Sequence, residues 1–271
     1  MKNSLPEVSI VTMLQALPPP SPRRAISAMM LREMASTYAR TPGGWVWAVA
    51  EPVAAIALLS LVFQLAFDAP PLGHSFVLFY ATGYLPFMMF TDISVKLANA
   101  LRFSRPLLAY PAVTGLDALL ARLLLNSLTH LLVVLVVLGG VEALFRTGAQ
   151  YDPATILATL AMTIALAAGV GTLNCFLFMR LPVWERVWQI ATRPLFLISG
   201  IFFLIEDVPG GWRDIAWFNP LFHITSMMRA GAYPTYAAAH ASPHFVWGVA
   251  LACLALGLLI LRFLRKDLAL G

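Results

Sequence analysis

Six long apolar runs, separated by shorter polar stretches, dominate the pattern of this 271-residue chain. A bilayer core about 30 Å thick requires about 20 mainly apolar residues in a spanning helix. Each run meets that length, so we expect an all-α integral membrane protein with six transmembrane helices. The expected spans are Trp45–Phe67, His74–Ile93, Leu116–Leu144, Pro153–Met179, Val187–Ile205 and Phe245–Leu264.

Three stretches outside these runs have patterns of their own. Residues 24–40 place Met30, Leu31 and Met34 on one helical arc and charged residues on the other, which predicts an amphipathic helix at the cytoplasmic membrane surface. An ordinary helix packed on protein is the alternative. The loop 94–115 is too polar to span the membrane, and residues 206–243 contain aromatic and proline residues in short apolar pieces. The latter predict short outer helices or a re-entrant segment between spans five and six.

The distribution of basic residues predicts the orientation. If the N-terminus is cytoplasmic, fifteen of the eighteen Lys and Arg residues fall on inner segments, and only Arg146, Arg213 and Arg229 fall outside. The positive-inside rule therefore places both termini in the cytoplasm. Hydrophobic residues make up 60% of the chain and charged residues only 11%, which indicates a lipid environment. The bases flank apolar runs, so topology explains the net charge of +5 and no nucleic-acid partner is expected.

The motifs of several functional classes are missing from the sequence. It contains no G-x-x-x-x-G-K-[ST] motif, so no phosphate cradle for ATP can be built and any hydrolysis requires a separate ATPase subunit. The histidines have no metal-ligand spacing, so we expect no metal. Cys175 and Cys253 lie in apolar runs, where cysteine behaves as a small hydrophobe. A membrane enzyme is disfavoured, and the lack of clear inverted repeats disfavours a secondary transporter.

Ionisable residues inside apolar runs mark candidate sites, because charge in lipid is costly. Glu51 lies seven residues into the first span, Asp92 ends the second, and Arg122 and His130 lie in the third. Glu51 either faces a polar route or a partner helix, or it snorkels or pairs with Arg40 or Arg122. Both interpretations stay open at this point.

Several motifs together resemble the capsular-polysaccharide export permeases, which are membrane subunits of type-2 class ABC exporters. The first motifs are Leu-Arg-Glu-Met at 31–34, Tyr-Ala-Arg at 38–40, Gly-Trp-Val-Trp at 44–47 and Glu51-Pro52. The later ones are Arg-Leu-Pro-Val-Trp at 180–184, the run at 197–203, Asn-Pro-Leu-Phe-His at 219–223 and Arg-Ala-Gly at 229–231. The resemblance covers about residues 25–265. Many relatives carry an acid where this chain has Ser226, so a role for that acid cannot be carried over.

The resemblance implies a homodimer of six-helix subunits in the bacterial inner membrane, joined by two copies of a cytosolic ATPase that bind ATP and Mg. It implies export of a lipid-anchored, acidic polysaccharide or glycolipid, and it allows periplasmic export proteins as partners. Residues 1–22 form a proline-containing extension outside the match, and 23–271 form a single permease domain. The alternative substrates are O-antigen, teichoic acid, lipid or drug.

Two sets of candidate site residues follow from these considerations. Aromatic density in the first two spans and the basic arc of the 24–40 helix predict a substrate path at Arg32, Arg40, Trp45, Trp47, Glu51, Tyr80, Tyr84 and Phe87. A lipid-facing aromatic belt is the alternative. The loop 94–115 is the longest inner segment after the first span, and the resemblance points to the same loop for coupling. ATPase contacts are therefore expected at Arg102, Phe103, Arg105 and Tyr110, although attachment to lipid headgroups would use the same residues.

Overall fold

The computed structural model describes residues 22–38, 43–108 and 113–268, and every regular element in these ranges is a helix. In chain order the helices are α2 (Pro22–Tyr38), α3 (Gly44–Ala66), α4 (Phe76–Ala98), α5 (Ala100–Leu108), α6 (Gly115–Phe145), α7 (Pro153–Arg180), α8 (Pro182–Ile198), η1 (Ile205–Asp207), α9 (Gly210–Trp217), α10 (Pro220–Ala232) and α11 (Pro243–Leu268). The all-helical expectation is confirmed, as is the presence of short helices between the last two apolar runs.

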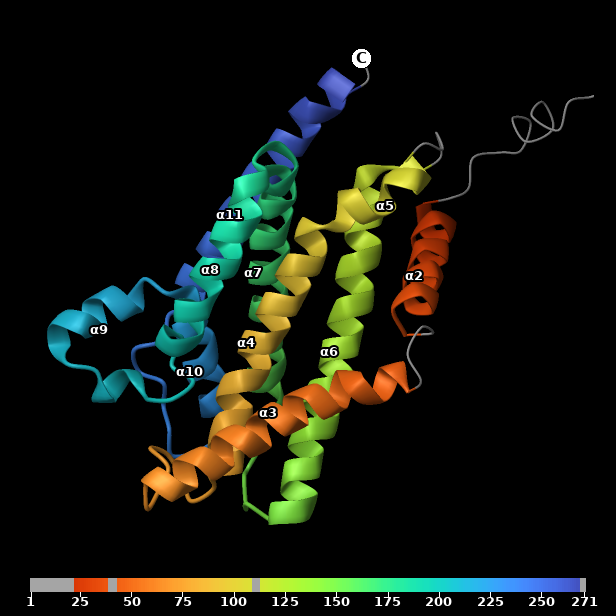
Figure 1. Ribbon diagram of the computed structural model, residues 1–271. Coiled ribbons are helices and arrows are strands. Elements are labelled where there is room, and N and C mark those ends of the chain that lie inside the picture. The colour runs from red at the N-terminus through yellow and green to blue at the C-terminus, as the bar shows by residue number, and fades with distance from the viewer. Residues whose placement is uncertain (1–21, 39–42, 109–112, 269–271) are drawn as a thin grey trace, which may run out of the picture.

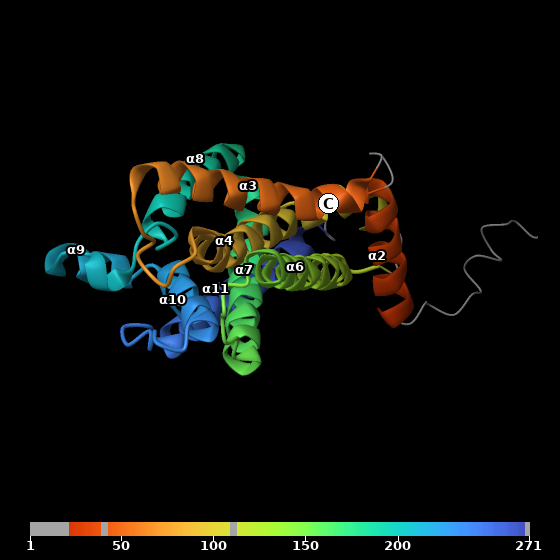
Figure 2. The ribbon, with the colours of Figure 1, turned by 90° about the horizontal axis from the view of Figure 1, so that it is seen from below.

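Four long helices, α4, α6, α7 and α11, run side by side, and α3 crosses α4 and α6 obliquely on one face (Figures 1 and 2). Helix α7 is central and packs on both α4 and α11. Glycines permit this approach, because a Cβ on Gly171 would lie 2.8 Å from the Ser94 carbonyl oxygen and one on Gly169 would press into the Ala250 carbonyl oxygen. Helix α5, the turn between α7 and α8, and the end of α11 lie at one end of the bundle, here called the α5 end.

Local sequence explains where several of these helices begin. The Thr114 hydroxyl accepts from the backbone N–H of Asp117, whose carboxylate accepts in return from the backbone N–H of Thr114, and this capping box starts α6. Asp152 caps α7 and is followed by Pro153 at the first helical position. In lipid a helix satisfies every internal backbone group, so such apolar runs stay helical until a cap or a breaker intervenes.

The fifth expected span differs from the structure. Helix α8 begins at Pro182, within the stretch expected to be the loop 180–186, and only Leu181 separates it from α7. It ends at Ile198 rather than Ile205, because the chain turns at Gly200, whose φ of 72° suits glycine. The described residues therefore contain five helices that are long and apolar enough to cross a membrane, and α8 with 17 residues is not among them.

Helix α2 also differs from its expected orientation. Its buried positions are Ala25, Met29 and Glu33, one turn apart, and they face α6. Glu33, expected on the polar arc, lies inside this contact, whereas Leu31, expected on the apolar arc, is 65% exposed. The physical reason is that a buried arginine on α6 pairs with Glu33, so packing on protein determines which face is covered.

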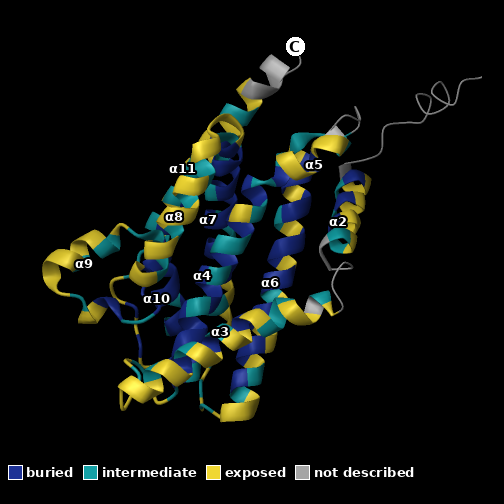
Figure 3. Cartoon of the chain, viewed as in Figure 1, coloured by how far each residue is buried: buried dark blue, intermediate teal, exposed yellow. Residues whose placement is uncertain are grey.

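Burial is concentrated in α4 and α7, whereas α3, α8 and α11 expose most of their surface (Figure 3). Helix α8 has no buried residue. Leu65 on α3 and Val183 on α8 are among the most exposed apolar side chains. Such surfaces require lipid or another protein against them.

Candidate functional site

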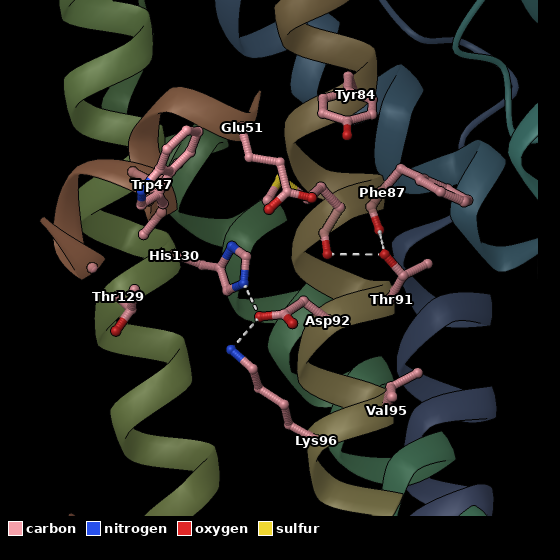
Figure 4. Close-up of a pocket in the computed structure, with 14 residues that line it drawn as sticks. Trp47, Glu51, Tyr84, Phe87, Thr91, Asp92, Val95, Lys96, Thr129 and His130 are labelled. Atoms are coloured by element: carbon pink, nitrogen blue, oxygen red, sulfur yellow. Dashed lines mark hydrogen bonds and ion pairs between the residues drawn. The ribbon is translucent and has the colours of Figure 1, made fainter. Parts of the chain in front are cut away.

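A cavity of about 550 Å³ lies between α3, α4 and α6, toward the α5 end of α4 (Figure 4). Such a volume is typical of sites for small organic ligands, which are commonly about 300–1,000 Å³. Both polar and aromatic side chains reach it. The lining residues are Gly44, Trp47, Ala48, Glu51, Tyr84, Phe87, Met88, Thr91, Asp92, Val95, Lys96, Thr129, His130 and Val133.

Three ionisable side chains form a linked group on one wall. One carboxylate oxygen of Asp92, Oδ2, lies 2.8 Å from Lys96 Nζ and 2.7 Å from His130 Nε2. Lys96 is one helical turn beyond Asp92 on α4, which brings the two side chains together, whereas His130 comes from α6. Asp92 thus engages both basic side chains of the cavity, Lys96 and His130, through a single oxygen.

Glu51 lies opposite this group on α3 and points into the same space (Figure 4). The pairing of Glu51 with Arg122 that the sequence left open is wrong, because Arg122 pairs with Glu33 instead. Across the ranges that the structure describes, Glu51 makes no ion pair. Of the two carboxylates that line the cavity, Glu51 is therefore the one that none of the described cations engages.

Three aromatic residues, Trp47, Tyr84 and Phe87, also line the cavity. Tyr84 and Phe87 lie one turn apart on α4, and both contact Phe196 of α8 edge to face, with ring centroids 6.3 and 5.3 Å apart respectively. Trp47 approaches from α3. Phe196 of α8 thus packs against both α4 rings.

The structure brings together four residues of the expected substrate path, Trp47, Glu51, Tyr84 and Phe87. Tyr80 does not line the cavity; it is fully buried against Phe63 and Phe79. Arg32 lies on α2, with its guanidinium 5.5 Å from the Phe103 ring centre. Arg40 and the side chain of Trp45 lie outside the described residues.

The α5 end is held by a buried ion pair between α2 and α6. Arg122 Nε lies 3.1 Å from Glu33 Oε2, and neither side chain is more than 10% exposed. Arg122 also donates from Nη1 to the Lys96 carbonyl at 2.7 Å and stacks over the Phe103 ring at 4.3 Å. One guanidinium thereby connects α2, α4, α5 and α6.

The residues expected to contact an ATPase differ in what they already touch. Arg102 pairs with Glu185 of α8 at 3.0 Å and is 52% exposed. Phe103 packs against Arg122 but remains 41% exposed, and Arg105 is exposed. Tyr110 lies outside the described residues. Arg102, Phe103 and Arg105 are thus all exposed on α5, and of the two arginines Arg102 is already paired with Glu185.

Sequence reasoning noted Asp92 and His130 separately but did not join them with Lys96, and it placed Glu33 on a solvated arc. The i, i+4 spacing of Asp92 and Lys96 was a usable signal. No spacing relates Asp92 to His130 or Glu33 to Arg122, because each of those pairs joins two different helices.

The ABC-2 type transporter model matches residues 24–233, which run from the first turn of α2 to the end of α10. The chain belongs to the ABC-2 type transporter family. This match covers the cavity, α5 and the buried ion pair, and it confirms the resemblance seen in the motifs.

Three curated relatives align over most of their length. The chain is 27% identical to the polysialic acid transport protein KpsM of Escherichia coli over 88% of this chain and 92% of the relative. It is 24% identical to the capsule polysaccharide export inner-membrane protein CtrC of Neisseria meningitidis serogroup B. It is 25% identical to the capsule polysaccharide export inner-membrane protein BexB of Haemophilus influenzae. Both of these alignments cover 90% of this chain and 92% of the relative. With five apolar helices of spanning length, the chain is a multi-pass membrane protein.

Proposed function

We propose that this chain is the membrane-spanning subunit of an ATP-driven exporter that moves a capsular polysaccharide across the bacterial inner membrane. The observation that carries the proposal is the cavity between α3, α4 and α6, which combines carboxylates with aromatic rings. The relatives of the chain are named for polysialic acid transport or for capsule polysaccharide export. Sugars present hydroxyl groups and apolar ring faces, and such a cavity complements both.

Energy comes from a partner in this proposal, since the sequence has no nucleotide-binding motif. Two cytosolic ATPase subunits would bind ATP and Mg and act on two copies of this chain. The exposed apolar faces of α3 and α8 provide surface for the second copy or for lipid. With the α5 end in the cytoplasm, α8 and the turn after it would form a sixth crossing, shortened at Gly200 and continued by α9 and α10 on the outer side.

The route in this proposal begins at the α5 end. Arg32 and Arg40 would attract an acidic, lipid-anchored polymer to the mouth, and Trp47, Tyr84 and Phe87 would guide it past the cavity. Tyr80 is left out of the path, because its side chain is enclosed by the core.

We expect the combined change of Trp47, Tyr84 and Phe87 to Ala to reduce capsule export at least about tenfold. Each aromatic contact contributes about 0.5–1.5 kcal/mol, and three together exceed the 1.4 kcal/mol that changes binding tenfold. The measurement is surface polysaccharide in a capsule-forming strain that lacks its own permease and expresses this chain with its ATPase. Phe145→Ala, at an exposed ring outside the cavity, is the control. If the triple variant is present in the membrane at the normal amount and exports normally, the substrate does not pass through the cavity.

We expect Arg105→Glu to reduce co-purification of the ATPase and to abolish export while leaving folding intact. Arg105 is exposed on α5, and placing like charges together across an interface costs several kcal/mol. Arg146→Glu, at an exposed base beyond the other end of the bundle, is the matched control.

Reversing the charge of Arg102 alone would also break its ion pair with Glu185. The role of Arg102 is therefore tested by exchanging the two charges, with Arg102→Glu and Glu185→Arg in one variant. That double variant keeps an internal pair while it reverses the charge that α5 presents and, in the opposite sense, the charge of Glu185 on α8. If the complex with the ATPase and full export both persist in the Arg105 reversal and in the exchange variant, the ATPase must couple through another segment.

A further inference from the structure

The charges that line the cavity do not suit an acidic ligand. Glu51 and Asp92 contribute two negative charges and Lys96 contributes one positive charge. With His130 neutral the described lining carries a net charge of −1, and with His130 protonated it carries zero. A carboxylate or phosphate entering the cavity would meet Glu51, and no unpaired cation among the described lining residues would compensate its charge.

The hydrogen-bonding capacity left in the cavity points in the same direction. Lys96 and His130 are both engaged by Asp92 Oδ2, which leaves the other Asp92 oxygen, Oδ1, and both Glu51 oxygens as acceptors. Ionised carboxylates accept hydrogen bonds only, whereas Lys96 Nζ keeps two N–H donors beyond the one directed at Asp92. Hydroxyl groups both donate and accept, so a ligand rich in hydroxyls matches this mixture of groups. The Thr91 hydroxyl donates to the carbonyls of Phe87 and Met88 and offers its oxygen as a further acceptor.

The aromatic rings and the volume of the cavity further restrict the class of ligand that fits it. Trp47 and Tyr84 give flat apolar surface beside these acceptors, and the buried ring of Phe87 lies against Phe196. A volume of about 550 Å³ suits a few rings rather than a coiled stretch of polymer. A group with many hydroxyl donors and an apolar ring face meets all of these conditions.

We infer that this cavity binds an uncharged sugar ring, even though the exported polymer as a whole is expected to be acidic. The inference rests on the proposed function and adds which part of the substrate enters the membrane. The acidic units stay at the mouth, near the bases of α2 and α5, while a neutral unit occupies the space between Glu51 and Asp92. That unit is either the one next to the lipid anchor or an internal one.

The test measures how fast a maleimide labels Val95→Cys in the full-length chain held in phosphatidylcholine nanodiscs, with Cys175 and Cys253 changed to Ala. Val95 lines the cavity and is 40% exposed. Maltotriose and trigalacturonic acid are the neutral and acidic probes of matched length. At ten times its dissociation constant a bound probe slows labelling about tenfold. Thr91→Cys is a second reporter on the same wall.

We expect maltotriose to protect both reporters and trigalacturonic acid to leave them unprotected. Glu51→Lys changes the lining by two charges, so it should weaken protection by maltotriose and allow protection by the acid. Asp68→Lys makes the same change in an exposed loop outside the cavity and should alter neither result. Glucosyl diacylglycerol in the nanodisc distinguishes the sugar unit next to the lipid anchor from an internal unit. Stronger protection by this lipid than by maltotriose indicates that the cavity binds the unit next to the anchor, and weaker protection indicates that it binds an internal unit.

Equal or better protection by trigalacturonic acid in the chain with Glu51 intact would overturn the inference. So would protection by tetraethylammonium in the absence of protection by maltotriose, which would make the cavity a cation site. Protection by no probe at either reporter would show that the cavity binds no sugar. Because none of these readouts requires export, they are separate from the test of the proposed function.

Discussion

Arg122→Met should destabilise the α5 end more than any other single change at that end. The substitution leaves the Glu33 carboxylate buried without its partner, and breaking a buried ion pair from one side costs about 3–5 kcal/mol. It also removes the bond to the Lys96 carbonyl and the contact with the Phe103 ring, which contributes about 0.5–2 kcal/mol. We therefore expect a lower unfolding temperature in detergent and loss of ATPase binding.

The companion variant Arg122→Met with Glu33→Leu separates the ion pair from general packing. Replacing both partners of a buried pair by apolar residues is often close to neutral, so much of the lost stability should return. Arg24→Met, at an exposed arginine of α2, should leave the unfolding temperature unchanged. If the double variant is less stable than Arg122→Met, Glu33 is stabilised by something other than Arg122 and the assignment of the pair as the link is wrong.

Arg229→Met should have the second large effect, on the segment between α8 and α10. Arg229 is 1% exposed, and its guanidinium donates to the carbonyls of Ile201 at 2.9 Å and Phe203 at 3.1 Å while it lies 4.0 Å from the Phe79 ring centre. Burial lowers the pKa of Arg229 to about 10, so the group stays charged at neutral pH. Each carbonyl left unsatisfied costs about 1–3 kcal/mol.

The measurement is limited proteolysis of residues 199–219 together with thermal unfolding. Arg229→Lys should rescue little, because an ammonium group lacks the planar fork that reaches two carbonyls. Gly83→Ala should reproduce part of the effect, since its Cβ would lie 3.1 Å from both Arg229 Nη2 and the Ile201 Cα. Arg193→Met, at an exposed arginine of α8, is the control. Proteolysis unchanged in Arg229→Met would mean that the turn at Ile201 is held by other contacts.

Most of the long helices were predictable from residue pattern alone. Trp45–Phe67, Leu116–Leu144 and Pro153–Met179 each lie within one residue of α3, α6 and α7 at both ends. The reason is local: lipid forces an apolar run into a helix, and caps such as Thr114 and Asp152 act within one turn. The end of α8 was missed because hydropathy continues through Ile201 to Leu204, whereas the backbone turns at Gly200.

The cavity was only half predictable. Trp47, Glu51, Tyr84 and Phe87 were candidates because aromatic and acidic residues stand out in apolar runs, but the same criteria also selected Tyr80. Tyr80 and Tyr84 lie one turn apart on α4, and only the packing of Phe63 and Phe202 encloses Tyr80 while the cavity between α3 and α6 receives Tyr84.

The sequence by itself determined the class of the protein, the course of its long helices and its family motifs, because hydropathy, caps and motif order depend on neighbouring residues. Tertiary structure alone decided that Asp92 engages His130 in addition to Lys96, that Glu33 turns inward to Arg122, and that α8 is short. Interhelical pairs such as Asp92–His130 and Glu33–Arg122 depend on how far each helix is rotated about its axis. That rotation is determined by the packing of the whole bundle, through close contacts such as Gly171 against Ser94.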